Sequence, residues 1–564
     1  MLKTVGIGVQ NFEKIITNDI FYIDKTPFIK EWWESGDDVT LITRPRRFGK
    51  TLNINMLEYF FSIQYANKGD LFENLSIWKE EIYRNLQGTY PVISLSFADI
   101  KRTDYESVKQ EIYYLLVKLY EKNRFLLDSD LLTDIEKELF QSISMDMNEV
   151  IATRAIQSLC EYLYRYYGKK VILLLDEYDT PMQEAYVNGF WEELVSFIRN
   201  FFNTTFKTNP YLLRAVMTGI TRVSKESIFS DLNNLEVVTT TSDKYATYFG
   251  FTEEEVFTAL EMYGLGMEKE EVKAWYDGFI FGEQKDIYNP WSILNFLDKG
   301  KYSTYWANTS SNGLVSKLIR EGNKTIKHTF EELLRGKTIR CPIDEQIVYN
   351  QLDDNHDAIW SLLVASGYLK VVSYEQEDLI EEEAVMYELT LTNFEVKRMF
   401  YNMVRGWFGK AKEYYNEFIR ALLRNDVEEM NEYMNRVALN TFSYFDTGNS
   451  LFGDEPERFY HGFVIGLLVD LNKEYIVLSN RESGFGRYDV MIEPKEKEKD
   501  AFILEFKVHD PEEENSLKDT VQKALQQIED KQYETLLIAK GILGEHIHRY
   551  GFAFEGKTIL IGGQ

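Results

Sequence analysis

The chain has 564 residues, of which 44% are hydrophobic and 27% are charged. This composition is ordinary for a globular protein, leaves room for about three or four domains of roughly 150 residues each, and excludes global disorder. The net charge is −28. Such a surface excludes a broad basic face and the non-specific coating of polyanions, although a local basic groove stays open.

The two cysteines, Cys160 and Cys341, are too few for a disulfide scaffold or a thiolate zinc site, and they favour a reducing, cytoplasmic location. The first residues, MLKTVGIGVQNFEKI, lack the basic-then-apolar layout of a signal peptide. The longest apolar runs, such as VILLL at 171–175, are far shorter than the ~20 residues that a membrane-spanning helix needs. We therefore expect no membrane partner.

Residues 1–300 alternate short apolar runs with longer amphipathic segments. Four runs are typical of buried strands: DVTLIT at 38–43, YPVISLSF at 90–97, KVILLLD at 170–176 and LLRAVMTG at 212–219. The segment 105–127 is one of the amphipathic stretches between them and predicts a helix. Strands that alternate with helices predict an α/β domain whose parallel sheet is covered on both faces.

Residues 301–440 are expected to be mostly helical. Within them, AIWSLLVASG at 358–367 predicts a helix, and 368–373 and 384–391 predict two strands around an acidic tip at 375–383. This outline fits a winged-helix unit, but the commoner arrangement of a helix with a packed hairpin is the favoured interpretation. The acidic run Glu381–Glu383 argues against contact between this tip and DNA.

Residues 441–564 predict a separate α/β domain. In chain order we expect a helix at 457–471, a strand at 475–478, and a hairpin formed by GRYDVMI at 486–492 and FILEFKV at 502–508 around a charged tip at 495–500. A helix at 516–533 and a last strand at 535–539 complete this domain.

The segment TRPRRFGKT at 43–51 lies between a predicted strand and a predicted helix, as a phosphate-binding loop requires. Unpaired amides at a helix N-terminus attract phosphate, Lys50 would reach the β- and γ-phosphates, and the Thr51 hydroxyl would hold Mg²⁺. Arg44 stands where the pattern has its first glycine. The nucleotide-binding candidates in this loop are Arg46, Arg47, Phe48, Gly49, Lys50 and Thr51.

A second motif, VILLLDE at 171–177, is a hydrophobic strand that ends in two acids. Asp176 would bind Mg²⁺ through its water shell, and Glu177 is the candidate that polarises an attacking water. A third buried strand ends in MTGITR at 217–222. There Thr218 could report the γ-phosphate, and Arg222 could stabilise its charge in cis or across a subunit boundary, or simply face solvent.

In the last domain, Asp489 is on the first hairpin strand and Glu505 and Lys507 are on the second. Residues two apart on a strand share a face, and two carboxylates beside a lysine are costly in an apolar core unless they bind a cation such as Mg²⁺ or Mn²⁺. Ion pairs across an exposed hairpin give the same pattern, but FIL at 502–504 is too apolar for that. A preceding helix with Glu457 and a following helix with Gln526 complete the order of a restriction-type nuclease.

Three histidines receive no site role: His461 is interpreted as structural, and His546 and His548 have no acidic or cysteine partner at metal-ligand spacing.

These residues resemble the AAA-ATPase-like proteins of bacteria and some archaea that carry a C-terminal PD-(D/E)XK nuclease-like domain. The resemblance rests on FYIDKT at 21–26, RPRRFGKT at 44–51, LLDEYDTP at 174–181, MTGITRVS at 217–224, WYDGFIF at 275–281 and YNPWSILNFL at 288–297, and in the tail on ERFYHG at 457–462, RYDV at 487–490, LEFKV at 504–508 and ALQQIEDKQY at 524–533. It implies that RPRRFGKT is the usual loop of the family. In the nuclease site Glu457 is the expected helix carboxylate and metal ligand, with Glu455 as the alternative.

The sequence therefore predicts an α/β protein with a P-loop ATPase domain at 1–300, a mostly helical region at 301–440 and a restriction-endonuclease-like domain at 441–564. Its expected cofactors are ATP and Mg²⁺ or Mn²⁺, and its expected partner is nucleic acid, DNA rather than RNA. Nucleotide state would gate phosphodiester cleavage, possible settings being defence or mobile elements, and ATP would drive homo-oligomer assembly. The alternative is a nucleotide-switched module that binds nucleic acid or protein without cutting.

Overall fold

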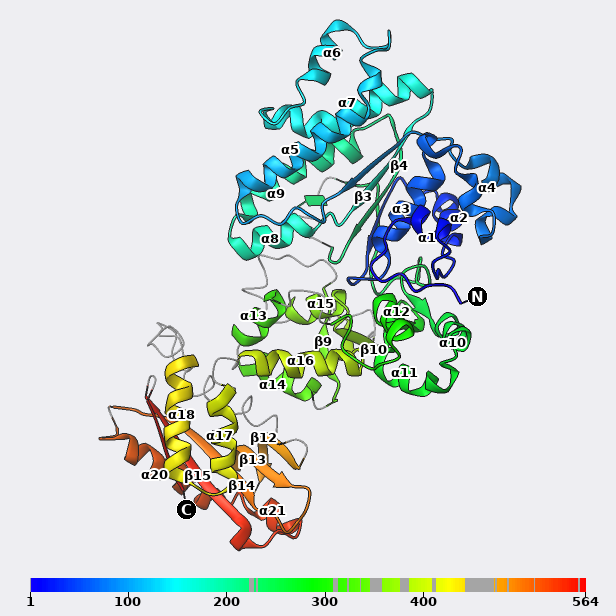
Figure 1. The fold of residues 1–564 in the computed structure, drawn as a ribbon. Coiled ribbons are helices and arrows are strands. Elements are labelled where there is room, and N and C mark those ends of the chain that lie inside the picture. Colours follow the sequence, from blue (N-terminus) through cyan, green and yellow to red (C-terminus); the bar gives the residue numbers. More distant parts are fainter. Residues whose placement is uncertain are drawn as a thin grey trace. The chain divides into compact units, whose positions relative to one another are not determined.

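The computed structural model describes residues 2–222, 228–229, 232–307, 313–321, 324–334, 336–344, 358–375, 385–407, 412–441, 471, 474–483, 486–511, 513–555 and 558–563. The chain divides into two compact units, Met1–Met399 and Phe400–Gln564, which we call the first and the second unit (Figure 1). The three-part division expected from the sequence stays a prediction.

The centre of the first unit is a five-stranded parallel sheet with the order β2-β3-β4-β1-β5. Its strands are β1 (Val39–Thr43), β2 (Val92–Ser96), β3 (Val171–Asp176), β4 (Leu212–Gly219) and β5 (Leu235–Val238). Every residue of β1 and β3 is buried, as expected for strands covered on both faces. The four strands predicted from the sequence and their parallel arrangement are confirmed.

Helices cover both faces of this sheet (Figure 1). On one face lie α5 (Tyr105–Lys122), α7 (Glu149–Tyr167) and α9 (Trp191–Phe202), whose apolar stripes form one core with the strands. On the other face lie α1 (Phe12–Thr17), α2 (Pro27–Ser35), α3 (Lys50–Phe61) and α4 (Glu81–Leu86). α6 (Asp134–Gln141) and α8 (Thr180–Asn188) are the remaining α-helices described before β5.

A small sheet, β6-β8-β7, follows with strands Phe251–Thr252, Gln284–Tyr288 and Phe279–Phe281, in that order. It is accompanied by α10 (Glu253–Met262), α11 (Lys269–Tyr276) and α12 (Pro290–Lys299). The last elements that begin in the first unit are α13 (Gly313–Glu321), α14 (Lys324–Leu334), β9 (Ile339–Pro342), α15 (Ala358–Ala365), β10 (Leu369–Glu375), β11 (Met386–Leu391) and α16 (Phe394–Trp407).

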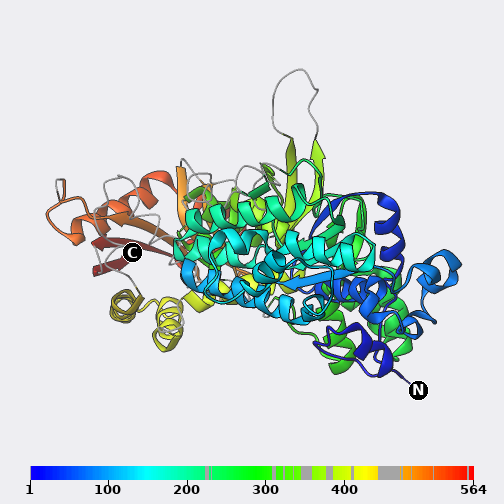
Figure 2. The same cartoon turned by 90° about the horizontal axis from the view of Figure 1, so that it is seen from above.

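The predicted helix, strand, strand order is confirmed by α15, β10 and β11, and the two strands stand side by side in yellow-green in Figure 2. The sequence missed β9, which pairs antiparallel with β11, so the hairpin belongs to a three-stranded sheet with the order β10-β11-β9. Residues 376–384, which include most of the expected acidic tip, lie outside the described residues. The winged-helix assignment stays a prediction.

The second unit contains a five-stranded mixed sheet with the order β12-β13-β14-β15-β16, in which only β14 and β15 run parallel. Its strands are Tyr475–Ser483, Gly486–Pro494, Ala501–Val508, Ile547–Glu555 and Thr558–Gly563. One face packs against α17 (Lys412–Leu423) and α18 (Val427–Thr441), and the other against α20 (Leu517–Lys531) and α21 (Thr535–Ala539). The predicted hairpin is β13 and β14.

One predicted strand is wrong: Thr535–Ala539 forms the short helix α21. In this run Leu537 is the buried residue, whereas Ile538 is 52% exposed. Periodicity alone cannot separate such a short apolar run from a strand, and the last strands are instead β15 and β16. The helix predicted at 457–471 lies outside the described residues except for Leu471. No helix in the described ranges combines the length and apolarity needed to cross a membrane.

Candidate functional site

The loop at 43–51, which we call the phosphate loop, leaves the sheet at the end of β1, one of its interior strands. β1 lies between β4 and β5, and α3 begins at Lys50 directly after Gly49. Gly49 has a φ of +81°, a left-handed conformation that glycine adopts at little cost. The first-turn amides of α3 have no partner within the helix, so they point into the loop as candidate anion donors.

Arg44, at the position of the missing glycine, is a buried structural residue. Its guanidinium donates to the carbonyl oxygens of Thr43 at 2.9 Å and Thr239 at 2.5 Å, and its centre lies 4.6 Å from the ring of Phe281. Burial lowers the pKa of Arg44 to about 9. The hydrogen bonds of Arg44 therefore link the start of the loop to the segment after β5.

Lys50 is buried, with its ammonium against its own loop. Nζ donates to the carbonyl oxygens of Arg44 at 2.9 Å and Pro45 at 2.8 Å. Burial lowers the pKa of Lys50, and the charges of Glu177 and Asp176 oppose that shift. The two loop carbonyls thus accept the hydrogen bonds that phosphate oxygens would accept from Lys50 in a nucleotide complex.

Asp176, at the end of β3, joins three elements of the site. Thr51 Oγ1 of α3 donates to Asp176 Oδ2 at 2.7 Å, and Thr218 Oγ1 of β4 donates to Oδ1 at 2.5 Å. Burial raises the pKa of Asp176, while the two hydroxyl hydrogen bonds lower it. The hydroxyl of Thr51 and the carboxylate of Asp176 are hard oxygen donors, which suits Mg²⁺.

Glu177 follows in a left-handed conformation with a φ of +51°. Its amide donates to Thr218 Oγ1 at 3.3 Å, and its Oε2 accepts from Thr180 Oγ1 at 3.3 Å. The two acids of the motif therefore separate: Asp176 lies among the strand ends, and the carboxylate of Glu177 lies at the start of α8.

Asp179 is a functional candidate that the sequence reasoning missed. It is buried, and its Oδ2 accepts from the amides of Ile220 at 3.0 Å and Thr221 at 2.9 Å and from Thr221 Oγ1 at 3.0 Å. Burial raises the pKa of Asp179. It fixes the turn after β4, and Arg222 follows that turn directly. The signal was the third acid in LLDEYDTP at 174–181.

Phe48 is a core residue of the phosphate loop. Its ring is fully buried and packs edge-on against Phe279 at 4.8 Å and Phe281 at 5.4 Å. Only its backbone can therefore serve a nucleotide. The guanidinium of Arg46 donates to Gln183 Oε1 at 3.2 Å, and that of Arg47 lies 4.4 Å from the ring centre of Trp291.

A hydrogen-bonded chain leads from the loop to α16. The carbonyl of Arg46 accepts from the indole Nε1 of Trp306 at 2.9 Å, and the amide of Trp306 donates to Glu395 Oε1 at 2.6 Å. Glu395 is fully buried, and its Oε2 accepts from Ser292 Oγ at 2.8 Å. Burial raises the pKa of Glu395 to about 7.

In the second unit, Asp489 and Glu505 lie on adjacent antiparallel strands, one step beyond the pair Val490 and Leu504. The amide of Phe506 donates to Asp489 Oδ2 at 2.9 Å, and the amide of Asp489 donates to Glu505 Oε2 at 3.4 Å. Glu505 is only 2% exposed. Lys507 is half-buried two residues further along the same strand.

Comparison with known protein families gives one match within each unit. Residues 6–229 match the family described as "Predicted AAA-ATPase", and residues 455–563 match the PD-(D/E)XK nuclease superfamily. The chain joins an AAA-ATPase-like part to a PD-(D/E)XK nuclease-like part. The resemblance and the α/β fold class stated from the sequence are therefore confirmed.

The chain is also similar to a protein of Azotobacter chroococcum mcd 1 described as "Uncharacterized protein in vnfD 5'region". The two are 27% identical over 321 residues, which cover 57% of this chain. The match spans about half, 56%, of the relative's own length.

Of the two neighbouring glutamines on α20, it is Gln527 and not Gln526 that contacts Glu505. Gln527 Nε2 donates to Glu505 Oε1 and, at 3.1 Å, to the hydroxyl of Tyr533, whereas Gln526 is exposed and donates to Asp530. One position along a helix turns a side chain by about 100°, so the neighbour faces elsewhere. Burial raises the pKa of Tyr533 to about 12, and the charges of Glu505 and Asp489 add to this shift.

Glu457 and its alternative Glu455 lie outside the described residues. Within the residues that are described, no group of three or more His, Cys, Asp or Glu side chains is arranged to hold a metal ion. Asp489 and Glu505 therefore form a pair of hard oxygen donors, a set that suits Mg²⁺ or Mn²⁺ but that needs further ligands.

The sequence shows no acidic partner for His546 and His548 at metal-ligand spacing, but in the fold both contact Asp500. His546 Nδ1 lies 2.8 Å from Asp500 Oδ1, and His548 Nε2 lies 3.1 Å from Asp500 Oδ2. The parallel pairing of β14 and β15, which sets Phe502 opposite His548, brings the start of β14 to these histidines. Sequence spacing could not reveal this long-range contact.

Proposed function

We propose that this protein binds and hydrolyses ATP and that its nucleotide state controls a nuclease dependent on Mg²⁺ or Mn²⁺. The observation that carries the proposal is the cluster at the strand ends, where Thr51 and Thr218 both donate to Asp176 beside the buried Lys50. The family matches at both ends of the chain support the pairing of the two activities.

In the first unit, Lys50 would exchange the carbonyl oxygens of Arg44 and Pro45 for phosphate oxygens. Thr51 and Asp176 would hold Mg²⁺, which screens the phosphate charge. Glu177 would polarise the attacking water. Thr218, which contacts both Asp176 and the amide of Glu177, would report the γ-phosphate.

In the second unit, Asp489 and Glu505, with Glu457 as the expected third carboxylate, would hold the nuclease metal. A bound divalent ion supplies an activated water and offsets the charge of the phosphodiester. Lys507 would stabilise the charge that builds on the phosphorus oxygens. The hydrogen bond from Gln527 would orient Glu505. The proposed substrate is nucleic acid, DNA rather than RNA, and a role in defence or mobile-element biology is part of the proposal.

A second candidate is a nucleotide-switched module that holds nucleic acid or a protein without cutting. The net charge of −28 favours it, because neutralisation of phosphates dominates nucleic-acid affinity. The hydrogen bonds that Asp489 and Glu505 already accept from backbone amides and Gln527 favour it as well.

The deciding experiment incubates the full chain with plasmid DNA, single-stranded DNA and RNA. Each substrate is tested with Mg²⁺, Mn²⁺ or chelator, and with ATP, ADP or no nucleotide. We expect cleavage that requires the metal, changes with the nucleotide and is lost in Asp489→Ala. Nucleic-acid binding without cleavage under every condition would favour the second candidate.

A further inference from the structure

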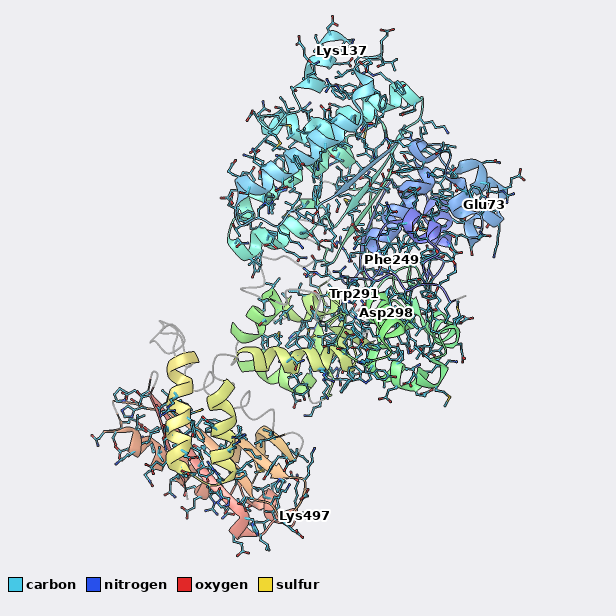
Figure 3. All side chains as sticks on the ribbon, in the orientation of Figure 1. Glu73, Lys137, Phe249, Trp291, Asp298 and Lys497 are labelled. Atoms are coloured by element: carbon cyan, nitrogen blue, oxygen red, sulfur yellow. The ribbon has the colours of Figure 1, made fainter. Side chains whose placement is uncertain are left out.

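Trp291 lies beside the phosphate loop at the start of α12, and Figure 3 labels it where the five-stranded sheet meets α10–α12. The buried Asn289 caps this helix, since its Oδ1 accepts from the amides of Trp291 at 2.9 Å and Ser292 at 3.3 Å. The side-chain amide of Asn289 also donates to the carbonyl of Arg46 at 3.3 Å. One residue therefore fixes both the loop and the backbone of Trp291.

One face of the Trp291 ring is covered by the side chain of Arg47, which a ligand could displace. Arg47 is exposed, belongs to the phosphate loop and places its guanidinium 4.4 Å from the ring centre. Within the described part of the chain, no carboxylate forms an ion pair with Arg47. Another arginine over tryptophan in this unit differs: Arg214 lies 5.0 Å from Trp33 and also donates to the carbonyl oxygens of Trp32 and Trp33, which fix it.

The N-terminal segment borders the same ring. A Cβ on Gly8 would lie 3.9 Å from Cζ3 of Trp291, so the backbone there passes within van der Waals reach. Gly8 has a φ of +77°, which favours glycine. The half-exposed ring of Trp291 therefore lies between the backbone at Gly8 and the phosphate loop. A nucleotide could place its base against this ring and its phosphates in the loop.

We propose that Trp291 is the stacking platform for the base of the bound nucleotide and that Arg47 covers it until the nucleotide binds. This inference rests on the proposed nucleotide function. Stacking of a base on an aromatic ring is worth roughly 5- to 150-fold in affinity, whereas an exposed cation–π contact is worth only about 2- to 5-fold. A base therefore displaces the guanidinium, which then pairs with the phosphates.

The test compares ATP with inorganic triphosphate, which has the phosphates but no base. Calorimetry with Mg²⁺ measures both dissociation constants for wild type, Trp291→Ala, Trp291→Phe and Arg47→Met. We expect Trp291→Ala to weaken ATP about tenfold or more and to change triphosphate affinity by less than about twofold. Trp291→Phe should keep most of the ATP affinity, and Arg47→Met should weaken both ligands.

Trp275→Phe is the matched control, since the ring of Trp275 also carries an arginine, Arg398, at 5.5 Å. Equal effects of Trp291→Ala on both ligands, or no effect on either, overturn the platform while leaving nucleotide binding in place. A wild type that binds neither ligand overturns the proposed function itself. If Trp291→Ala does not fold, Trp291→Leu takes its place. A wild type that binds triphosphate as tightly as ATP would also refute the proposed stacking of the base on Trp291.

Discussion

The polar side chains at the end of the central strands are bonded to one another. Lys50 holds two loop carbonyls, and Thr51 and Thr218 share the carboxylate of Asp176. Under the proposed function, each of these groups would exchange a partner when a nucleotide and its metal bind. Because Lys50, Asp176 and Thr218 are buried, a substitution that removes one partner leaves another polar atom unsatisfied, which costs about 1–3 kcal/mol.

Lys50→Ala should remove most of the affinity for ATP, because it deletes the ammonium that would contact the β- and γ-phosphates. Glu177→Gln should keep binding and slow hydrolysis, because an amide cannot accept the proton of the attacking water. Calorimetry measures the first effect and phosphate release the second. Hydrolysis by Lys50→Ala at the wild-type rate would refute the assignment of the loop.

Asp489→Ala and Lys507→Ala should both abolish cleavage for different reasons. The first removes a metal ligand, so it should also weaken Mn²⁺ binding measured by calorimetry. The second removes a charge-stabilising donor, which is worth on the order of 10²–10³ in rate, and should leave Mn²⁺ bound. ATP hydrolysis should survive both changes. A Lys507→Ala protein that loses Mn²⁺ affinity would contradict these roles.

Gln527→Ala should destabilise the second unit by about 1–3 kcal/mol, because the buried Glu505 loses a hydrogen-bond donor. Gln526→Ala is the matched control: it is the neighbouring residue, of the same type, and exposed. Urea unfolding of both variants measures the difference. Equal stability of the two would show that the contact with Glu505 contributes nothing.

At the level of elements, continuous apolar runs made β1 and β3 predictable. β5, LEVV at 235–238, escaped because it is short and half-buried, and so its hydrophobic signal is weak. Within the site, the strand-end position of Asp176 followed from the sequence. The partners of Asp179, Asp500 and Glu505 did not, because they are set by strand order and helix rotation rather than by local pattern.

Glu395 on α16 makes the stability of the folded protein depend on pH. Its pKa in the folded protein is raised from 4.5 to about 7 by burial, so the folded state binds its proton more tightly than the unfolded state. The stabilisation is fully present below about pH 4.5 and is lost as the pH rises through 7. Its size is on the order of 3 kcal/mol.

The free energy of unfolding of the wild type should therefore fall between pH 5 and pH 7.5, in part because Glu395 loses its proton. Glu395→Gln keeps an acceptor oxygen but cannot titrate, so we expect it to remove the contribution of Glu395 to this fall. Urea titrations at the two pH values measure it, with the exposed Glu254→Gln on α10 as the control. Identical pH slopes for wild type and Glu395→Gln would show that Glu395 does not titrate in this range.

At the scale of the whole molecule, the position of Arg222 predicts that copies of the chain assemble when ATP binds. It directly follows the turn that Asp179 fixes after β4, a position from which an arginine could complete the nucleotide site of a neighbouring copy. Light scattering with a non-hydrolysable ATP analogue should then show a larger particle, and Arg222→Ala should lower ATP hydrolysis. A constant monomer mass together with full activity of Arg222→Ala would refute this arrangement.

The strand order also has a consequence during synthesis. β1 is the first strand of its sheet to leave the ribosome, yet both of its neighbours, β4 and β5, come much later in the chain. At typical translation rates the apolar run VTLIT stays without a partner for about 10–30 s. The phosphate loop is therefore synthesised early, but β1 beside it cannot join the sheet until residue 238 has emerged. During this interval chaperones would have to shield the strand.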